Sequence, residues 1–138
     1  MKIILLILSA VLTGCLQTGD NNVKNKIPFP KRIIGDEFEI AYGQTIVHEA
    51  YDLEISFDRI EESRCPPEVL CFWEGDAVVS LRIKNLDNQQ QDTVKIGLFG
   101  NLAPRLVFID NVQLELVEVN FPAQLDDYVA KIKIRGPR

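Results

Sequence analysis

The stretch that decides the fold is YDLEISFD, residues Tyr51 to Asp58. Its side chains alternate at every position: Tyr51, Leu53, Ile55 and Phe57 fall on one face, and Asp52, Glu54, Ser56 and Asp58 on the other. Successive side chains of a β-strand point to opposite faces, so this pattern predicts a strand with one buried face and one acidic face. The acidic face favours a basic neighbour. We therefore expect this strand to pair with the strand that ends at Lys84 or with the last strand, whose outward residues are basic.

The same period of two recurs along the chain from about Ile33. It is present in the runs FEIAY (38–42), TIVH (45–48), AVVSLRIK (77–84), TVKIGLF (93–99), VQLELVEVNF (112–121) and YVAKIKIR (128–135), and RLVFID (105–110) is a short apolar run. The apolar phase slips by one residue in the run 112–121, which predicts a β-bulge near Leu116 or Val117. No sustained helical period follows the first 32 residues. The sequence therefore predicts an all-β fold, an antiparallel β-sandwich of immunoglobulin-like or similar type, over residues 33–138.

The composition narrows the class of protein. The chain has 138 residues, which suits one domain, and 46% of them are hydrophobic, enough to bury a core. The net charge is −5. A nucleic-acid-binding protein normally has a basic excess or a basic face, so we expect no nucleic-acid partner.

The first residues, MKIILLILSAVLTGC, have the layout of an export signal. One positive charge at Lys2 precedes an apolar run from Ile3 to Leu12, which is too short to span a bilayer as a mature helix. The ending LTGC resembles the lipobox of bacterial lipoproteins. That resemblance implies a lipid anchor on the Cys15 thiol, palmitate included, and makes residues 1–14 a lipoprotein signal peptide.

Residues 15–32 are rich in Asn, Lys, Gly and Pro and show no period, so we expect a lipidated N-terminus followed by a flexible tether. The lipobox places the protein in the bacterial cell envelope, anchored to a membrane by its lipid. Leu16 stands where many enteric lipoproteins that stay in the inner membrane have aspartate. In a Gram-negative host we therefore expect the outer membrane, facing the periplasm.

The remaining two cysteines, Cys65 and Cys71, are left as one pair if Cys15 carries the lipid. Export places them in an oxidising compartment, where disulfides persist. The five intervening residues differ from the spacing of thioredoxin-like redox centres, and the chain has too few further Cys or His ligands for zinc. We interpret the pair as a structural disulfide, stiffened by Pro66 and Pro67, and expect no metal and no cofactor.

The sequence offers no catalytic constellation. His48 is the only histidine, and no serine lies in a nucleophile-elbow pattern. The acidic residues show no spacing that selects a catalytic pair, and we interpret them as solvated turns and strand faces: Glu61, Glu62, Glu74, Asp76, Asp126 and Asp127. We therefore name no catalytic residue and expect a protein that is not an enzyme.

Two interpretations compete for Trp73, which follows Cys71 and Phe72 directly. Its indole packs on the disulfide and closes one end of the core, or it is an exposed anchor for a partner, because tryptophan is enriched at binding hot spots. A turn and a strand start follow at once, which favours burial. The candidate interaction residues of this loop are Arg64, Glu68, Phe72 and Trp73.

The run SRCPPEVLCFWEGDAVVSL, residues 63–81, resembles a motif of small exported bacterial proteins, often lipoproteins, whose function is uncharacterised. The motif is SRCPxxVxCxWxGxA, and the matching residues are Ser63, Arg64, Cys65, Pro66, Val69, Cys71, Trp73, Gly75 and Ala77. The resemblance implies a small all-β domain and no particular activity.

From these observations we expect a lipid-anchored envelope protein that acts as a non-catalytic binding module. Its disulfide-closed loop, Glu61 to Gly75, would contact another envelope protein. The alternative is an inhibitor that inserts the same loop into the cleft of a secreted hydrolase, and an enzyme that uses carboxylates is the weakest hypothesis.

Overall fold

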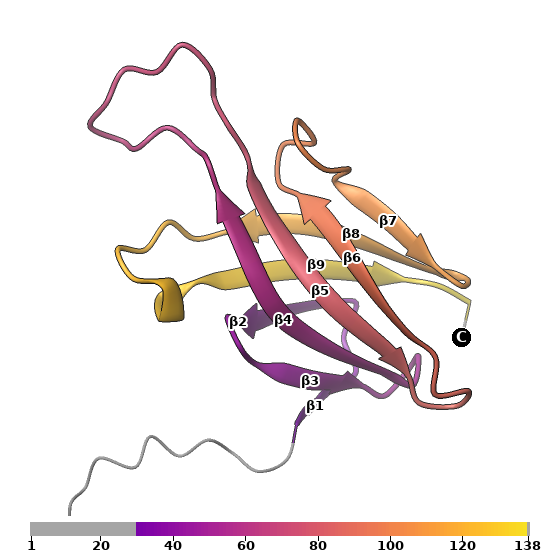
Figure 1. Cartoon of the computed structure of the whole chain (residues 1–138). Helices are drawn as coiled ribbons and strands as arrows, with labels where there is room; N and C mark the ends of the chain where they lie inside the picture. The colour runs from indigo at the N-terminus through magenta and orange to yellow at the C-terminus, as the bar shows by residue number, and fades with distance from the viewer. Residues whose placement is uncertain (1–29, 138) are drawn as a thin grey trace, which may run out of the picture.

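The fold is all-β, as predicted. A computed structural model describes residues 30–137. These residues form two sheets packed face to face (Figure 1). The strands are β1 (Lys31–Ile33), β2 (Glu37–Ala41), β3 (Thr45–His48), β4 (Leu53–Glu62), β5 (Ala77–Asn85), β6 (Gln91–Gly97), β7 (Leu106–Ile109), β8 (Val112–Val119) and β9 (Val129–Arg135). The expected signal peptide, the lipid site Cys15 and the tether as far as residue 29 lie outside the described residues. Within residues 30–137 the one helix is a 3₁₀ turn, Leu125–Asp127, and no helix has the length and apolar character to cross a membrane.

The start of the domain departs from the prediction of a tether up to residue 32 followed by antiparallel strands. One sheet has the order β1-β3-β4-β5-β6 and the other β2-β9-β8-β7. Neighbouring strands are antiparallel except β1, which runs parallel to β3 with Lys31 opposite Ile46. Lys31 and Arg32, which the sequence assigned to the tether, thus belong to a sheet, because their backbone pairs with the edge of β3.

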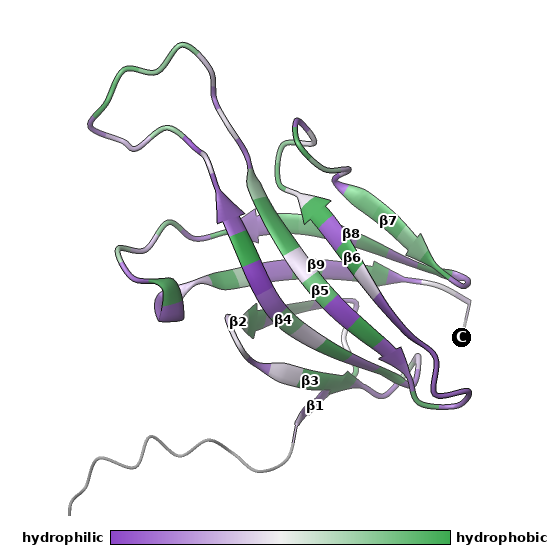
Figure 2. Cartoon of the chain, viewed as in Figure 1, coloured by the Kyte–Doolittle hydropathy of each residue, from purple (hydrophilic) through white to green (hydrophobic). Residues whose placement is uncertain are grey.

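The core lies between the two sheets and consists of the inward positions that the period of two predicts. On β4 and β5 the fully buried side chains include Ile55, Phe57 and Leu81, and Ile132 of β9 faces them from the other sheet. Figure 2 shows the alternation of hydrophobic and hydrophilic residues along these strands. Burial of each such side chain stabilises the fold by roughly 1.5–3 kcal/mol.

The charge-matched pairing of the strand Tyr51–Asp58 is confirmed. β4 lies beside β5, with Glu54 opposite Lys84 and Ser56 opposite Arg82. The Arg82 guanidinium donates to an Asp58 carboxylate oxygen at 3.1 Å. Such an exposed cross-strand pair contributes about 0.2–1 kcal/mol, enough to favour this register over a slipped one.

Two β-bulges bend the sheets. The predicted one is confirmed between Leu116 and Glu118, where β8 pairs with β9. A second, which the sequence analysis missed, lies between Phe57 and Arg59 of β4. Asp58 and Arg59 are both exposed, and beyond them the inward and outward positions of β4 are exchanged. The strand then continues to Glu62, where the cysteine loop follows.

Three loops lie at the same end of the sandwich: the β4–β5 loop (63–76), the β6–β7 loop (98–105) and the β8–β9 loop (120–128). The β4–β5 loop reaches well beyond the ends of its strands (Figure 1). β1 pairs at the level of Ile55, about seven residues or roughly 20 Å along β4 from Glu62. The chain therefore enters the sandwich far from these three loops.

Candidate functional site

The neck of the β4–β5 loop continues the pairing of the two strands. The Ser63 amide donates to the Asp76 carbonyl at 2.8 Å, and the Cys65 amide donates to the Glu74 carbonyl at 3.2 Å. Gly75 has a φ of 69°, and a Cβ there would lie 1.8 Å from the Ser63 carbonyl oxygen. Glycine is therefore the residue that lets the two sides of the neck approach this closely.

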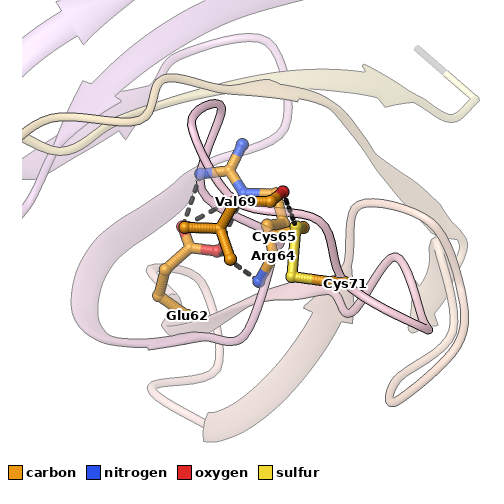
Figure 3. Close-up of a disulfide and its surroundings, with 5 residues drawn as sticks. All are labelled: Glu62, Arg64, Cys65, Val69 and Cys71. Carbon is orange, nitrogen blue, oxygen red and sulfur yellow. Dashed lines mark hydrogen bonds and ion pairs between the residues drawn. A yellow bond between two sulfur atoms is a disulfide. The ribbon is translucent and has the colours of Figure 1, made fainter.

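The predicted disulfide closes the tip of the loop. Cys65 and Cys71 are bonded, with their Cα atoms 5.9 Å apart (Figure 3). Between them Pro66 to Val69 form a turn in which the Val69 amide donates to the Pro66 carbonyl at 3.1 Å. Proline is favoured at the second position of such a turn, which Pro67 occupies. The ring and its prolines restrict the shape of the tip.

Arg64, one of the candidate interaction residues, is largely covered by the chain at the root of the loop. Its side chain is 12% exposed. Its Nε donates to Glu62 Oε1 at 2.9 Å, as Figure 3 shows, while Nη1 and Nη2 donate to the carbonyls of Val119 and Asn120 at 2.8 and 2.7 Å. Guanidinium offers several donors in one plane, so one side chain joins the end of β4 to the end of β8 in the other sheet.

Two aromatic side chains complete the arginine clamp, the name we give to Glu62, Arg64, Phe121 and Tyr128. The guanidinium carbon of Arg64 lies 4.9 Å from the centre of the Phe121 ring, within the range of a cation–π contact. The Tyr128 hydroxyl donates to Glu62 Oε2 at 3.2 Å. Burial raises the pKa of Tyr128, and the negative charge of Glu62 raises it further. The clamp thus holds the root of the β4–β5 loop against the β8–β9 loop.

Asp76 corrects the interpretation of the acidic residues as solvated: its side chain is fully buried. Its carboxylate accepts the backbone N–H groups of Phe99, Asn101 and Leu102 at 2.9, 3.0 and 3.2 Å. Burial by itself raises the pKa of Asp76, but these N–H donors outweigh it, and the net pKa lies below the ordinary 3.8. Asp76 is therefore a charged centre that organises the β6–β7 loop.

The expected packing of Trp73 on the core is wrong. Its side chain is 73% exposed, and Phe72 is fully exposed. The β4–β5 loop reaches beyond the ends of its strands (Figure 1), and the core leaves most of the indole uncovered. Glu68, a third candidate, is also exposed.

Two further apolar residues of the tip, Val69 and Leu70, are exposed at 56% and 102%. The sequence analysis did not select them. A signal was present, because a ring of so few residues has no interior in which Val69 and Leu70 could be buried. We call Val69, Leu70, Phe72 and Trp73 the apolar tip; Figure 2 shows hydrophobic residues along much of this loop.

His48 has a structural place far from the apolar tip. It is fully buried, its Nε2 lies 2.9 Å from the Gly35 carbonyl oxygen, and its ring packs between those of Phe38 and Tyr51. The histidine thus ties the segment between β1 and β2 to the core. Over residues 30–137 no three His, Cys, Asp or Glu side chains are grouped so that they could hold a metal ion.

No protein-family model, no curated protein and no solved structure matches this chain. The candidate site is therefore defined by its own geometry: a disulfide-closed tip of exposed apolar side chains on a root held by Arg64 and Asp76.

Proposed function

We propose that the protein is a lipid-anchored module of the bacterial cell envelope that binds another envelope protein through the apolar tip, without catalysing a reaction. The observation that carries this proposal is the exposure of four large apolar side chains, Val69, Leu70, Phe72 and Trp73, on one closed loop. A contiguous exposed apolar patch on a folded protein commonly marks an interaction site. Covering such side chains contributes roughly 1.5–3 kcal/mol each, of which only part remains as binding energy.

The way the loop is held supports the same proposal. The disulfide, the turn at Pro66–Val69 and the contacts of Arg64 restrict the loop in the free protein. Association then orders few additional bonds, and preorganisation of this kind raises affinity without new contacts. Aromatic residues at the centre of an interface frequently provide most of its binding energy, which makes Phe72 and Trp73 the principal contact residues of the proposal.

The shape of the loop also favours the second candidate function, inhibition of a secreted hydrolase. Within the segment Glu61–Gly75, the part that follows β4 projects beyond the strands (Figure 1) and is closed by a disulfide, the form that suits insertion into an enzyme cleft. In both functions the same residues meet the partner. The nature of that partner distinguishes the two.

Site-specific photo-crosslinking in the living host tests the binding proposal. A photoreactive phenylalanine analogue is placed at Phe72 or Trp73 of the full chain. The matched control position is Ile34, which is 66% exposed and lies between β1 and β2. We expect a crosslinked envelope protein from positions 72 and 73 and none from position 34. Equal crosslinking from all three positions, or none from 72 and 73, would exclude the apolar tip as the binding site.

The captured partner then decides between the two functions. A protease or glycosidase whose activity falls when the full chain is added, and recovers with Trp73→Ser, identifies an inhibitor. A partner without hydrolase activity identifies a binding module.

The lipid anchor has a separate test. We expect metabolic labelling of the chain with a palmitate analogue, and loss of both label and membrane association in the Cys15→Ser variant. Labelling that persists in this variant would show that the lipid is attached elsewhere.

A further inference from the structure

Exposed apolar side chains are not confined to the tip of the β4–β5 loop. Phe99 and Leu102 of the β6–β7 loop are 51% and 67% exposed, and Phe121 and Leu125 of the β8–β9 loop are 43% and 50% exposed. With the apolar tip, these make eight of the eleven large hydrophobic side chains that are exposed within residues 30–137. Most of the large hydrophobic side chains that are exposed within residues 30–137 thus lie on the three loops at one end of the sandwich.

Contacts between the three loops fix their positions relative to one another. The Asn101 side-chain amide donates to the Gly75 carbonyl at 3.1 Å, which joins the β6–β7 loop to the neck of the β4–β5 loop. Asp76 joins the same two loops through the Phe99 amide. Arg64 joins the β4–β5 loop to Asn120 of the β8–β9 loop. The roots of the three loops are therefore held together in the free protein.

The charge on these three loops that is left without an ion-pair partner within the described residues has one sign. Four exposed carboxylates, Glu68, Glu74, Asp126 and Asp127, lie in these loops, and none forms an ion pair with another described residue. We call these four residues the acidic rim. The two cations of the loops are each paired within the chain: Arg64 with Glu62, and Arg105 with Glu115 at 3.6 Å.

We propose that the three loops form one docking surface for a protein partner whose contact face has an apolar groove flanked by lysine and arginine. The inference rests on the proposed function, since the apolar tip is part of this surface, and it adds the two neighbouring loops and the charge of the partner. Opposite charges around an apolar centre speed association and exclude partners of the wrong sign. The acidic rim disfavours the two other occupants, because an anionic bilayer and a second copy of this chain would both bring like charges together.

The test selects binding peptides without assuming their sequence. The full chain is reconstituted in nanodiscs of neutral phosphatidylcholine and presented to a library of short random peptides on phage, with empty nanodiscs for counter-selection. We expect the enriched peptides to combine aromatic or aliphatic residues with lysine or arginine and to contain few acidic residues. An enriched peptide, synthesised with a fluorescent label, should bind more weakly as salt concentration rises, because salt screens exposed charges.

Paired substitutions then separate the parts of the surface. We expect about tenfold weaker peptide binding for Phe99→Ser with Leu125→Ser, and a similar loss for Glu68→Lys with Glu74→Lys. Ile34→Ser, equally apolar and exposed but far from the loops, should bind as the wild type does. Phe121 is left unchanged because it packs on Arg64. Circular dichroism and urea midpoints verify that each variant is folded.

The outcomes distinguish this inference from the function on which it rests. If Phe72→Ser with Trp73→Ser weakens binding while the other two pairs stay within about twofold of wild type, the partner contacts the tip alone and the joint surface is wrong. If no loop variant changes binding, both proposals fail. Enriched peptides without basic residues, no enrichment over empty nanodiscs, tighter binding to anionic than to neutral vesicles, or a dimer lost with Phe72→Ser would each overturn the inference.

Discussion

Asp76→Asn should destabilise the fold substantially although it changes no apolar contact. Asp76 Oδ2 accepts the amides of Asn101 and Leu102, and Oδ1 accepts the amide of Phe99. Asparagine keeps one oxygen and turns an NH₂ group toward at least one of these N–H donors. A hydrogen bond to a charged group contributes about 1.5–3 kcal/mol, and the lost bond leaves a donor unsatisfied. We therefore expect the free energy of unfolding to fall by about 2–4 kcal/mol.

The pH dependence gives the same prediction a second test. Because the pKa of Asp76 in the folded protein lies below its ordinary value of 3.8, the carboxylate stabilises the fold fully above pH 3.8. That contribution is lost as the pH falls through the folded pKa, where the wild-type side chain becomes protonated. The difference between wild type and Asp76→Asn should therefore be largest near neutral pH and should shrink below pH 3.8.

Urea unfolding followed by circular dichroism measures both effects. Asp126→Asn is the matched control, because Asp126 lies at the same end of the sandwich but is exposed; it should change stability by no more than about 0.5 kcal/mol. A loss below about 0.5 kcal/mol for Asp76→Asn, or a difference that stays constant into the acid range, would refute the role assigned to this carboxylate.

Three further predictions concern the root of the loop. Arg64→Met should lower the free energy of unfolding by about 2–4 kcal/mol in urea, because the guanidinium no longer donates to Glu62 and to two backbone carbonyls; the exposed ion pair of Arg105 makes Arg105→Met a control worth under about 1 kcal/mol. Gly75→Ala should cost more than about 2 kcal/mol, since its Cβ would meet backbone at 1.8 Å. Gly43→Ala, with a similar φ but open space around it, should cost only about 1 kcal/mol, and equal losses at the two glycines would contradict the steric reason. The raised pKa of Tyr128 stabilises the fold below pH 10.0, so stability should fall as pH rises past this value, less so in Tyr128→Phe.

The features of the fold that follow from local pattern could be predicted from the sequence. The alternation in Tyr51–Asp58 and Tyr128–Arg135 predicted which faces of these strands are buried. The acidic face of β4 and the basic residues of β5 predicted that the two strands pair. The phase slip at Leu116 located one bulge. The parallel pairing of β1 was not predictable, because a strand of three residues is too short to show a period.

The roles of Arg64 and Asp76 could not be predicted because they depend on residues far away in the chain. Arg64 donates to carbonyls 55 and 56 residues later, and Asp76 accepts amides 23 to 26 residues later. The local sequence around a charged residue does not show whether its side chain is solvated or forms hydrogen bonds to backbone groups far away in the chain. The position of Trp73 was mistaken for a related reason. Apolar residues occupy the core only where the surrounding strands leave space, and a large part of any folded surface remains apolar.

The construction of the β4–β5 loop is difficult to explain by stability alone. Fourteen residues separate Glu62 from Ala77, whereas a hairpin between these strands needs only two to five. The residues that hold the loop against the other two, Arg64, Gly75 and Asp76, lie at its root. Its apolar residues are collected at the tip, where water reaches them. A disulfide that served only the core would not need to support Phe72 and Trp73 in solvent, an arrangement that lowers solubility and adds no packing. Rigid support at the root and exposed apolar groups at the tip together favour a surface built for contact.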